Sequence, residues 1–155
     1  MKKLIRVIQY GLGPIGVATA RLVMSRPGLK LVGVVDVNPE LVGKDLGNIP
    51  GMRARRTGIK VVDSIGKCRK ADVAVHCAGS RMPGIYEQLG ELARHGLDVV
   101  SSAEELLYPW FAHPGLARKL EKLCLGNKVT MHGTGVNPGF VMDTMALATT
   151  GVCHE

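Results

Sequence analysis

Aromatic side chains are scarce in this sequence, at 4% of its 155 residues. Hydrophobic residues still make up 46% of the chain, so we expect an aliphatic interior of the kind that fills parallel sheets. The formal net charge of +7 comes with basic clusters that lack interleaved aromatic residues. Surfaces that bind single-stranded nucleic acid combine both features. We therefore expect solvated basic faces and no nucleic-acid partner.

Paired cysteines and long apolar runs are also missing. Cys68, Cys77, Cys124 and Cys153 are scattered, without a C-x-x-C pair, so neither a metal site nor a disulfide framework is expected. Reduced thiols favour the cytoplasm. The first apolar run is interrupted by Arg6, and it predicts neither a signal peptide nor contact with a membrane.

Apolar runs that are typical of buried strands alternate with helical patterns along the chain. This alternation predicts an α/β fold with right-handed crossovers, that is, a doubly wound, mostly parallel sheet in one domain over 1–155. We expect strands at 4–9, 29–36, 59–64, 72–78, 97–102 and 128–133. We expect helices at 14–25, 81–95 and 103–125, the last divided by Pro109 and Pro114, a short helix and a loop within 39–52, a loop at 134–140 and a helix from 141.

The segment VIQYGLGPIG is the most informative motif. Its glycines Gly11, Gly13 and Gly16 fit G-x-G-x-x-G between a predicted strand and a predicted helix. Such glycines make the tight turn, let a pyrophosphate approach the backbone and let the helix pack on the sheet. The helix N-terminus adds free N–H groups and a positive dipole end. The motif predicts a Rossmann-type dinucleotide site formed by Gly11, Leu12, Gly13, Pro14, Ile15 and Gly16.

Asp36 ends the second predicted strand and bears on the choice of cofactor. A carboxylate there accepts hydrogen bonds from a ribose diol and repels a 2′-phosphate. The neighbours Val37 and Asn38 supply no cation. The sequence therefore favours NAD, and NADP stays open because basic residues elsewhere in the chain can fold back toward this site: Lys44, Arg53, Arg55 and Arg56.

Further candidate residues follow three other predicted strands. In open α/β sheets, ligands lie at the carboxyl ends of the strands. These ends are expected at 76–80, 100–105 and 132–139. Within the first of them, His76 is predicted to be a packed residue of the strand and not a catalytic base. Two alternatives stay open, namely Ser80 as the N-cap of the next helix and Asn137 as part of an Asn-Pro-Gly turn. The candidate cofactor contacts are Cys77, Ala78, Gly79, Ser80, Ser101 and Asn137.

Four segments carry a resemblance to a known family: GLGPIG, VDVNPELVGKDLG, VVSSAEELLYPW and GTGVNPGFVMD. They resemble the 2,4-diaminopentanoate dehydrogenases and native amine dehydrogenases, whose nucleotide-binding half is similar to the N-terminal domain of dihydrodipicolinate reductase. The resemblance implies NAD(P)-dependent, reversible oxidative deamination of an amine to a carbonyl compound and ammonia. It also implies a second domain that builds much of the substrate pocket and the subunit contact, so a homo-oligomer stays open.

The same resemblance implies that a glutamate of the SSAEEL segment, Glu104 or Glu105, is the catalytic acid/base. An apolar pocket would raise its pKa toward the working range, and Glu104 is preferred because it is nearer the strand end. The alternative is that both acids open a helix favourably. The chain ends at Glu155, where family members continue, so we expect a truncated cofactor domain with negligible turnover alone. A dihydrodipicolinate-reductase-like imine reductase and a non-catalytic NAD(P)-binding module remain alternatives.

Overall fold

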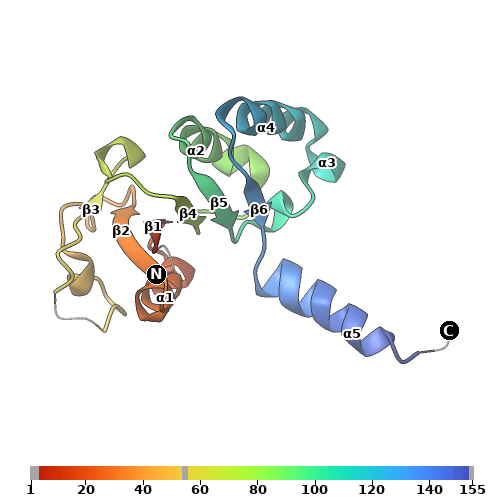
Figure 1. Cartoon of the computed structure of the whole chain (residues 1–155), viewed down its shortest axis with the longest axis horizontal. Coiled ribbons are helices and arrows are strands. Elements are labelled where there is room, and N and C mark those ends of the chain that lie inside the picture. Colours follow the sequence, from red (N-terminus) through yellow and green to blue (C-terminus); the bar gives the residue numbers. More distant parts are fainter. Residues whose placement is uncertain (1–3, 54–55, 154–155) are drawn as a thin grey trace.

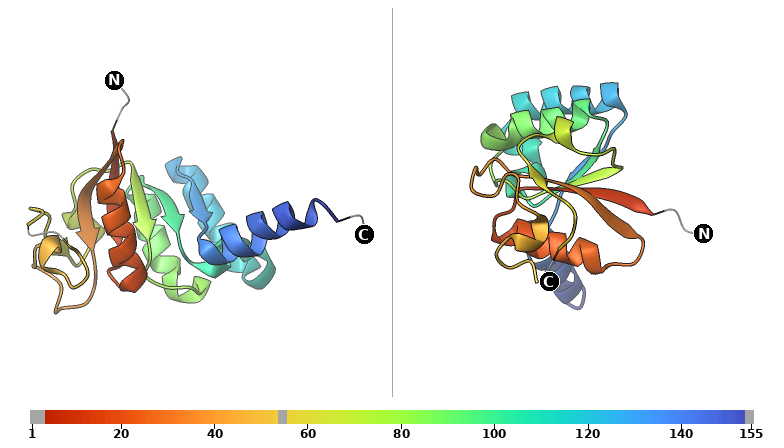
Figure 2. Two further views of the ribbon diagram at one scale, coloured as in Figure 1. Left: turned by 90° about the horizontal axis from the view of Figure 1, so that it is seen from below. Right: turned by 90° about the vertical axis from the view of Figure 1, so that its left-hand side faces the viewer.

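The computed structural model of the chain describes residues 4–53 and 56–153 (Figure 1). Six parallel strands form one sheet in the order β3-β2-β1-β4-β5-β6. Helix α1 covers one face of the sheet, and α2 and α4 cover the other (Figures 1 and 2). The order reverses between β1 and β4, which is the switch point of a doubly wound fold. The predicted fold class is confirmed.

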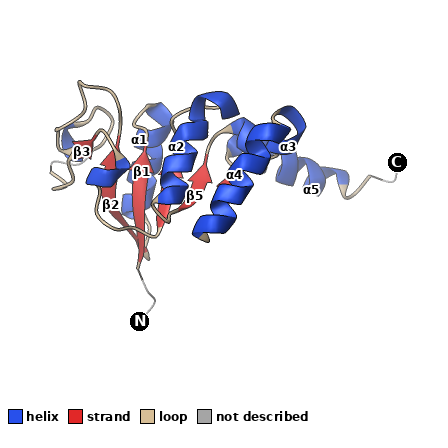
Figure 3. Cartoon of the chain, turned by 90° about the horizontal axis from the view of Figure 1, so that it is seen from above, coloured by secondary structure: helices blue, strands red, loops and turns tan. Residues whose placement is uncertain are grey.

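Each strand lies within or next to its predicted range. Most are shorter than the apolar runs that signalled them, because a run continues into the adjoining loop. The arrowheads of β1 and β5 point to the same edge of the sheet, where the candidate site residues were expected (Figure 3). The strands are β1 (Ile5–Tyr10), β2 (Leu29–Val35), β3 (Val61–Val62), β4 (Val73–His76), β5 (Asp98–Ser101) and β6 (Met131–Gly133).

The helices begin where proline favours a first turn. Proline lacks the N–H that a helix start leaves unpaired, and its fixed φ suits a helix. The predicted division of 103–125 is confirmed, since Pro109 and Pro114 each start a helix. The α-helices are α1 (Pro14–Ser25), α2 (Met82–Arg94), α3 (Pro109–Ala112), α4 (Pro114–Asn127) and α5 (Ala146–Thr150). Three 3₁₀ helices bear on the argument, η1 (Leu46–Asn48), η2 (Ile65–Lys67) and η3 (Glu104–Leu106).

Two aliphatic clusters form the core, one on each face of the sheet. The first surrounds Ile8, Leu89 and Leu92 between the sheet and α2. The second surrounds Val34 and Ala20 between the sheet and α1. All five are at most 1% exposed. The expected aliphatic interior is confirmed.

The segment 134–140 differs from its prediction. It is not all loop, because a wide π-helix, η4 (Val136–Met145), begins there and runs on into α5. Val136 begins this helix and Asn137 lies in its first turn, so the Asn-Pro-Gly signal falls at a helix start instead of in a reverse turn. The helical arm projects away from the sheet (Figure 1). Its apolar side chains are exposed, among them Val136, Phe140, Met142, Met145 and Leu147.

The connection from β2 to β3 contains little helix and is stabilised mainly by hydrogen bonds to the side chain of Asp45. Its short helix is only the three-residue η1. The Asp45 carboxylate accepts hydrogen bonds from the backbone of Gly47, Thr57 and Gly58 and from the Thr57 hydroxyl, at 2.8–3.0 Å. These bonds, led by the one from the Thr57 N–H, lower the pKa of Asp45 to about 2. Asp45 therefore ties two distant parts of the connection together.

The few aromatic residues gather mainly outside the core. Trp110 is the single tryptophan; it lies in α3, 43% exposed, with its ring centroid 5.7 Å from that of Tyr108. Phe111 beside it is 89% exposed. In the described part of the chain, no helix has both the length and the apolar character required to cross a membrane.

Candidate dinucleotide site and catalytic segment

The glycine turn is shaped by the absence of side chains. Gly11 has φ +90°, and a Cβ there would lie 2.8 Å from the carbonyl oxygen of Cys77. A Cβ on Gly16 would overlap the carbonyl oxygen of Gly11. A Cβ on Gly13 would meet nothing within 4 Å. Two of the glycines are therefore required by packing, while Gly13 borders open space.

Helix α1 begins directly after Gly13 and has no side-chain cap. The N–H groups of a first turn have no acceptor inside their helix, and with the helix dipole they favour an anion. The uncapped helix start and the open face of Gly13 together fit the pyrophosphate of a dinucleotide. The side chains of Leu12 and Ile15 differ, since Leu12 is buried in the core and Ile15 is exposed.

Asp36 lies beside this turn, as the motif predicts. Its Oδ2 accepts the N–H of Leu12 at 2.6 Å and its Oδ1 accepts the N–H of Asn38 at 2.8 Å. Each carboxylate oxygen has two lone pairs, so one on each oxygen remains for a ribose hydroxyl. The backbone bonds hold the carboxylate in place for that contact.

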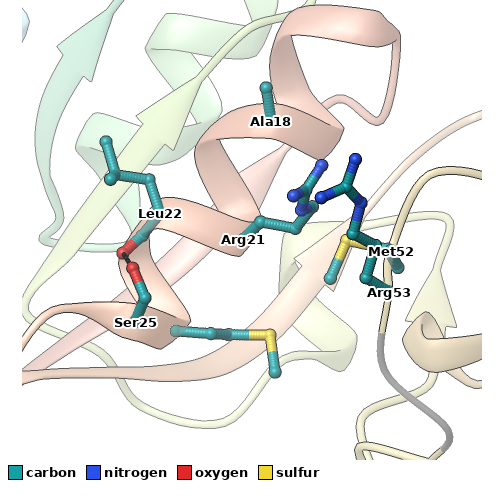
Figure 4. Close-up of a pocket in the computed structure, with 7 residues that line it drawn as sticks. Ala18, Arg21, Leu22, Ser25, Met52 and Arg53 are labelled. Atoms are coloured by element: carbon teal, nitrogen blue, oxygen red, sulfur yellow. Dashed lines mark hydrogen bonds between the residues drawn. The ribbon is translucent and has the colours of Figure 1, made fainter.

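One of the basic residues that kept NADP open, Arg53, lines a cavity whose described lining does not include Asp36. Arg53 lines a cavity of about 540 Å³ along α1 with Arg21 and Leu22, where the two guanidinium groups point toward each other (Figure 4). Lys44 and Arg56 are exposed, and Arg55 lies outside the described residues. In the described ranges, the lining of this cavity does not include Asp36.

The end of β4 reaches the glycine turn. The N–H of Cys77 donates to the carbonyl of Tyr10 at 2.8 Å, and Ala78 and Gly79 follow as exposed residues. His76 is fully buried, as predicted, with ring nitrogens 2.9 Å from Ser101 Oγ and from Gln88 Oε1. Burial lowers the pKa of His76. The Ser101 hydroxyl is thus already bonded inside the protein, and a cofactor contact by it stays a prediction.

Ser80 and Glu104 are brought together by the loops after β4 and β5. The Ser80 hydroxyl hydrogen-bonds the Glu104 carboxylate and lowers its pKa below the ordinary value. Helix α2 has Arg81 as its N-cap, without a side-chain bond, so the reading of Ser80 as the N-cap is wrong. Glu104 is exposed and ionised at neutral pH, which suits a group that accepts a proton.

Glu105 is engaged on one oxygen by two partners. Its Oε2 accepts the N–H of Met82, the first residue of α2, at 2.8 Å, and lies 2.9 Å from Nε2 of His113. The Met82 N–H first, and then His113, lower the pKa of Glu105. The expectation of a raised pKa is therefore wrong for both glutamates, because hydrogen bonds outweigh burial. Glu105 lies in η3, and its side chain accepts a hydrogen bond from the first residue of α2.

The end of β6 closes the same edge of the sheet. A Cβ on Gly133 would come within 2.5 Å of the backbone of Leu106 and Leu107, so this glycine allows β6 to pack on η3. A cavity of about 490 Å³ beside it is lined by Leu107, His132 and Phe140 among others. Asn137 is exposed in the first turn of η4, so the turn alternative is wrong and its cofactor contact stays a prediction.

Sequence reasoning missed two residues that organise the site. Gln9 is fully buried next to the glycine turn and its Nε2 donates to the carbonyl of Gly11 at 3.0 Å, while its Oε1 has no partner among the described residues. A polar residue in the apolar run VIQYG was the available signal. His113 gave no local signal, because its contact with Glu105 depends on how η3 and α3 fold together.

Comparisons with known proteins identify what this arrangement resembles. The chain is 31% identical over 153 residues to a 2,4-diaminopentanoate dehydrogenase of Acetoanaerobium sticklandii, covering 97% of the chain and 43% of that protein. It is 28% identical over 159 residues to an amine dehydrogenase of Streptomyces virginiae, covering 96% and 42%. The chain thus spans less than half the length of these curated relatives. No protein-family model matches it.

Solved structures agree with these relatives. The amine dehydrogenase from Mycobacterium smegmatis superposes with a TM-score of 0.85 at 32% identity, covering 97% of this chain and 45% of that one. An apo scyllo-inositol dehydrogenase from Lactobacillus casei superposes at 0.59 with 14% identity, which supports the fold alone. The resemblance to the 2,4-diaminopentanoate and amine dehydrogenases is confirmed. A Rossmann-type fold in a relative of dehydrogenases implies a nicotinamide dinucleotide as cofactor.

Proposed function

We propose that this chain is the cofactor-binding part of an NAD(P)-dependent amine or diamino acid dehydrogenase, which deaminates an amine oxidatively to a carbonyl compound and ammonia and runs the reverse. One observation carries the proposal: the uncapped α1 start and the open face of Gly13 occur in a chain that is similar, over nearly its whole length, to proteins named amine and diaminopentanoate dehydrogenases. When bound, the nicotinamide supplies the hydride chemistry that side chains lack.

NAD is the preferred cofactor in this proposal. The Asp36 carboxylate is fixed by the N–H groups of Leu12 and Asn38, and its remaining lone pairs suit two ribose hydroxyls. A 2′-phosphate would meet this negative charge without a compensating cation from Val37 or Asn38. Arg53, one of the basic residues that could supply such a cation, lines the α1 cavity instead.

Glu104 is the proposed catalytic base, and Glu105 holds the segment in place. Glu104 is exposed at the carboxyl edge of the sheet and is ionised at neutral pH, although the Ser80 hydrogen bond that lowers its pKa makes it a weaker base than an unbonded carboxylate. It can therefore accept a proton from the substrate ammonium or from the attacking water. Glu105 is a poorer base, because its Oε2 already serves the Met82 N–H and His113.

Two alternatives have less support. An imine reductase like dihydrodipicolinate reductase would act on a dicarboxylate, yet the sequence lacks the cationic substrate motif expected for one. A non-catalytic dinucleotide-binding module does not explain the similarity to two named dehydrogenases. We also propose a cytoplasmic location, since the four cysteines are free, and a homo-oligomer of the complete protein.

Calorimetric titration of the chain with NADH and NADPH tests the cofactor proposal. We expect NADH to bind more tightly than NADPH, and Gly13→Val to block binding because its side chain fills the phosphate space. Thermal unfolding of Gly13→Val provides the control, since a Cβ at this site meets no neighbour. Equal NADH binding by the two proteins would contradict the assignment of the turn.

A further inference from the structure

A cavity lined by basic side chains lies at the amino ends of the strands, at the end of the sheet opposite the glycine turn. Its volume is about 640 Å³, and it is formed at the amino ends of β1 and β2, before β3 and after η2 (Ile65–Lys67). Within the described part of the chain, none of its lining residues is acidic. The basic residues that line this amino-edge pocket are Arg6, Lys30, Lys60, Lys67, Arg69 and Lys70.

Only part of this positive charge is neutralised by neighbouring acids. Arg6 pairs with Asp72 at 2.6 Å, and Lys67 pairs with Asp63 at 2.7 Å. The other four cations make no ion pair with any described residue. Like charges gathered around one concave space repel each other in the empty protein, and this repulsion is relieved when an anion binds. These four cations are Lys30, Lys60, Arg69 and Lys70.

The floor of the pocket is shaped by an irregularity in β2. The pairing of β1 with β2 passes from Leu31 to Gly33, so Val32 is an extra residue with no partner in β1. Such bulges bend a strand and re-aim its side chains. Gly33 lets Cys68 pack closely, since a Cβ there would lie 3.0 Å from the Cys68 Sγ. Val32, Gly33 and Cys68 all line the pocket.

One side of the pocket is held rigidly. Thr57 and Gly58 line it, and both are fixed by hydrogen bonds to the Asp45 carboxylate. The oxygens of the Asp45 carboxylate accept hydrogen bonds from the backbone and from the Thr57 hydroxyl, and Asp45 is not among the described residues that line the pocket. It therefore fixes the shape of this side without adding an acidic group to the lining. The pocket thus combines a fixed wall, an apolar floor and uncompensated cations.

We propose that the amino-edge pocket binds a compact polyanion that carries several phosphate or carboxylate groups. Flexible lysines act as point charges toward such groups, and the concave shape fits a small molecule. The glycine turn lies at the other end of the strands, so the pocket is a second site, separate from the one assigned to the dinucleotide.

Calorimetric titration of the chain with inorganic triphosphate and with citrate, each in the presence of saturating NADH, tests the proposal. The informative variant is Lys60→Gln combined with Lys70→Gln, both exposed side chains. We expect it to weaken binding of the tighter probe by roughly tenfold, as the loss of two charge contacts implies. The tighter probe identifies whether phosphate or carboxylate groups are preferred. The NADH affinity should not change.

Lys119→Gln combined with Lys122→Gln is the matched control, because it removes the same charge from the exposed face of α4. We expect it to leave the affinity for the probe within about twofold. Amide resonances of Gly33 and Gly58 should shift on binding. Equal weakening by the two double variants, or no binding of either probe at millimolar concentration, would overturn the proposal. So would loss of probe binding in Gly13→Val.

Discussion

The β1–α1 turn and the segment after β5 lie at the same edge of the sheet but are fixed by different means. At the turn, Gly11 and Gly16 allow backbone to touch backbone, and side chains would only intrude. After β5, carboxylates hold the loops through hydrogen bonds to Ser80, Met82 and His113. The first region is therefore sensitive to volume, and the second to charge and pH.

Substitution of the glycines should separate packing from binding at the turn. Gly16→Ala places a Cβ on the Gly11 carbonyl oxygen, so we expect a loss of at least ~3 kcal/mol in the free energy of unfolding, the upper end for overpacking. Gly13→Ala should change that free energy by less than about 0.5 kcal/mol and should weaken NADH binding. Urea unfolding and calorimetry check both, and similar destabilisation by both changes would contradict the difference.

Glu104→Gln should show that the second region carries the chemistry. It keeps the shape of the side chain and removes the proton acceptor, so in the complete polypeptide the rate of NAD-dependent amine oxidation should fall by ~10²-fold or more, with cofactor affinity unchanged. Glu105→Gln is the matched variant one residue away. A larger loss of rate for Glu105→Gln than for Glu104→Gln would reverse the assignment.

The cofactor preference should respond to charge at one position of the turn. Replacing Asp36 by Ala together with Val37→Arg removes the repulsion of a 2′-phosphate and adds a cation, so we expect the NADP/NAD affinity ratio to rise by at least ~10-fold, equivalent to about 1.4 kcal/mol. Titration with NADH and NADPH measures it. Val37→Arg alone is the control, and an unchanged ratio in the double variant would show that Asp36 does not face the ribose.

Glu105 should make stability depend on pH in the acidic range. Its pKa is lowered from 4.5 by the Met82 N–H and His113, so its contribution is present above pH 4.5 and is lost as the pH falls through the lowered value. Glu105→Gln should thus be less stable than the native protein at pH 6–7, and the two should converge in acid. Urea unfolding between about pH 3 and 7 tests this, and a constant difference would contradict it.

Local signals in the sequence predicted much of the fold. Helix α1 has the predicted bounds, 14–25, because Pro14 and the apolar spacing both act within the segment. Pro109 and Pro114 divided the later helix as expected. The start of η4 was missed, because Asn-Pro-Gly suits a turn and a first helical turn equally well.

The polar contacts of the site were beyond such local reasoning. Ser80 and Glu104 come from separate crossovers, and their meeting depends on the pairing of β4 with β5. The lowered pKa values follow from those contacts, while the sequence alone indicated only a carboxylate near apolar residues. The extra residue at Val32, similarly, is a property of the register between β1 and β2 and of no single segment.

The position of Trp110 gives the molecule a one-sided optical reporter. Trp110 lies in α3, with its ring near that of Tyr108, and it is the single tryptophan of the chain. It therefore dominates the intrinsic fluorescence and senses the solvent around α3 and α4. Far-ultraviolet circular dichroism instead averages over every helix and strand. A denaturation profile recorded by emission will therefore coincide with one recorded by dichroism if the glycine-turn half and the α3–α4 half unfold as one cooperative unit.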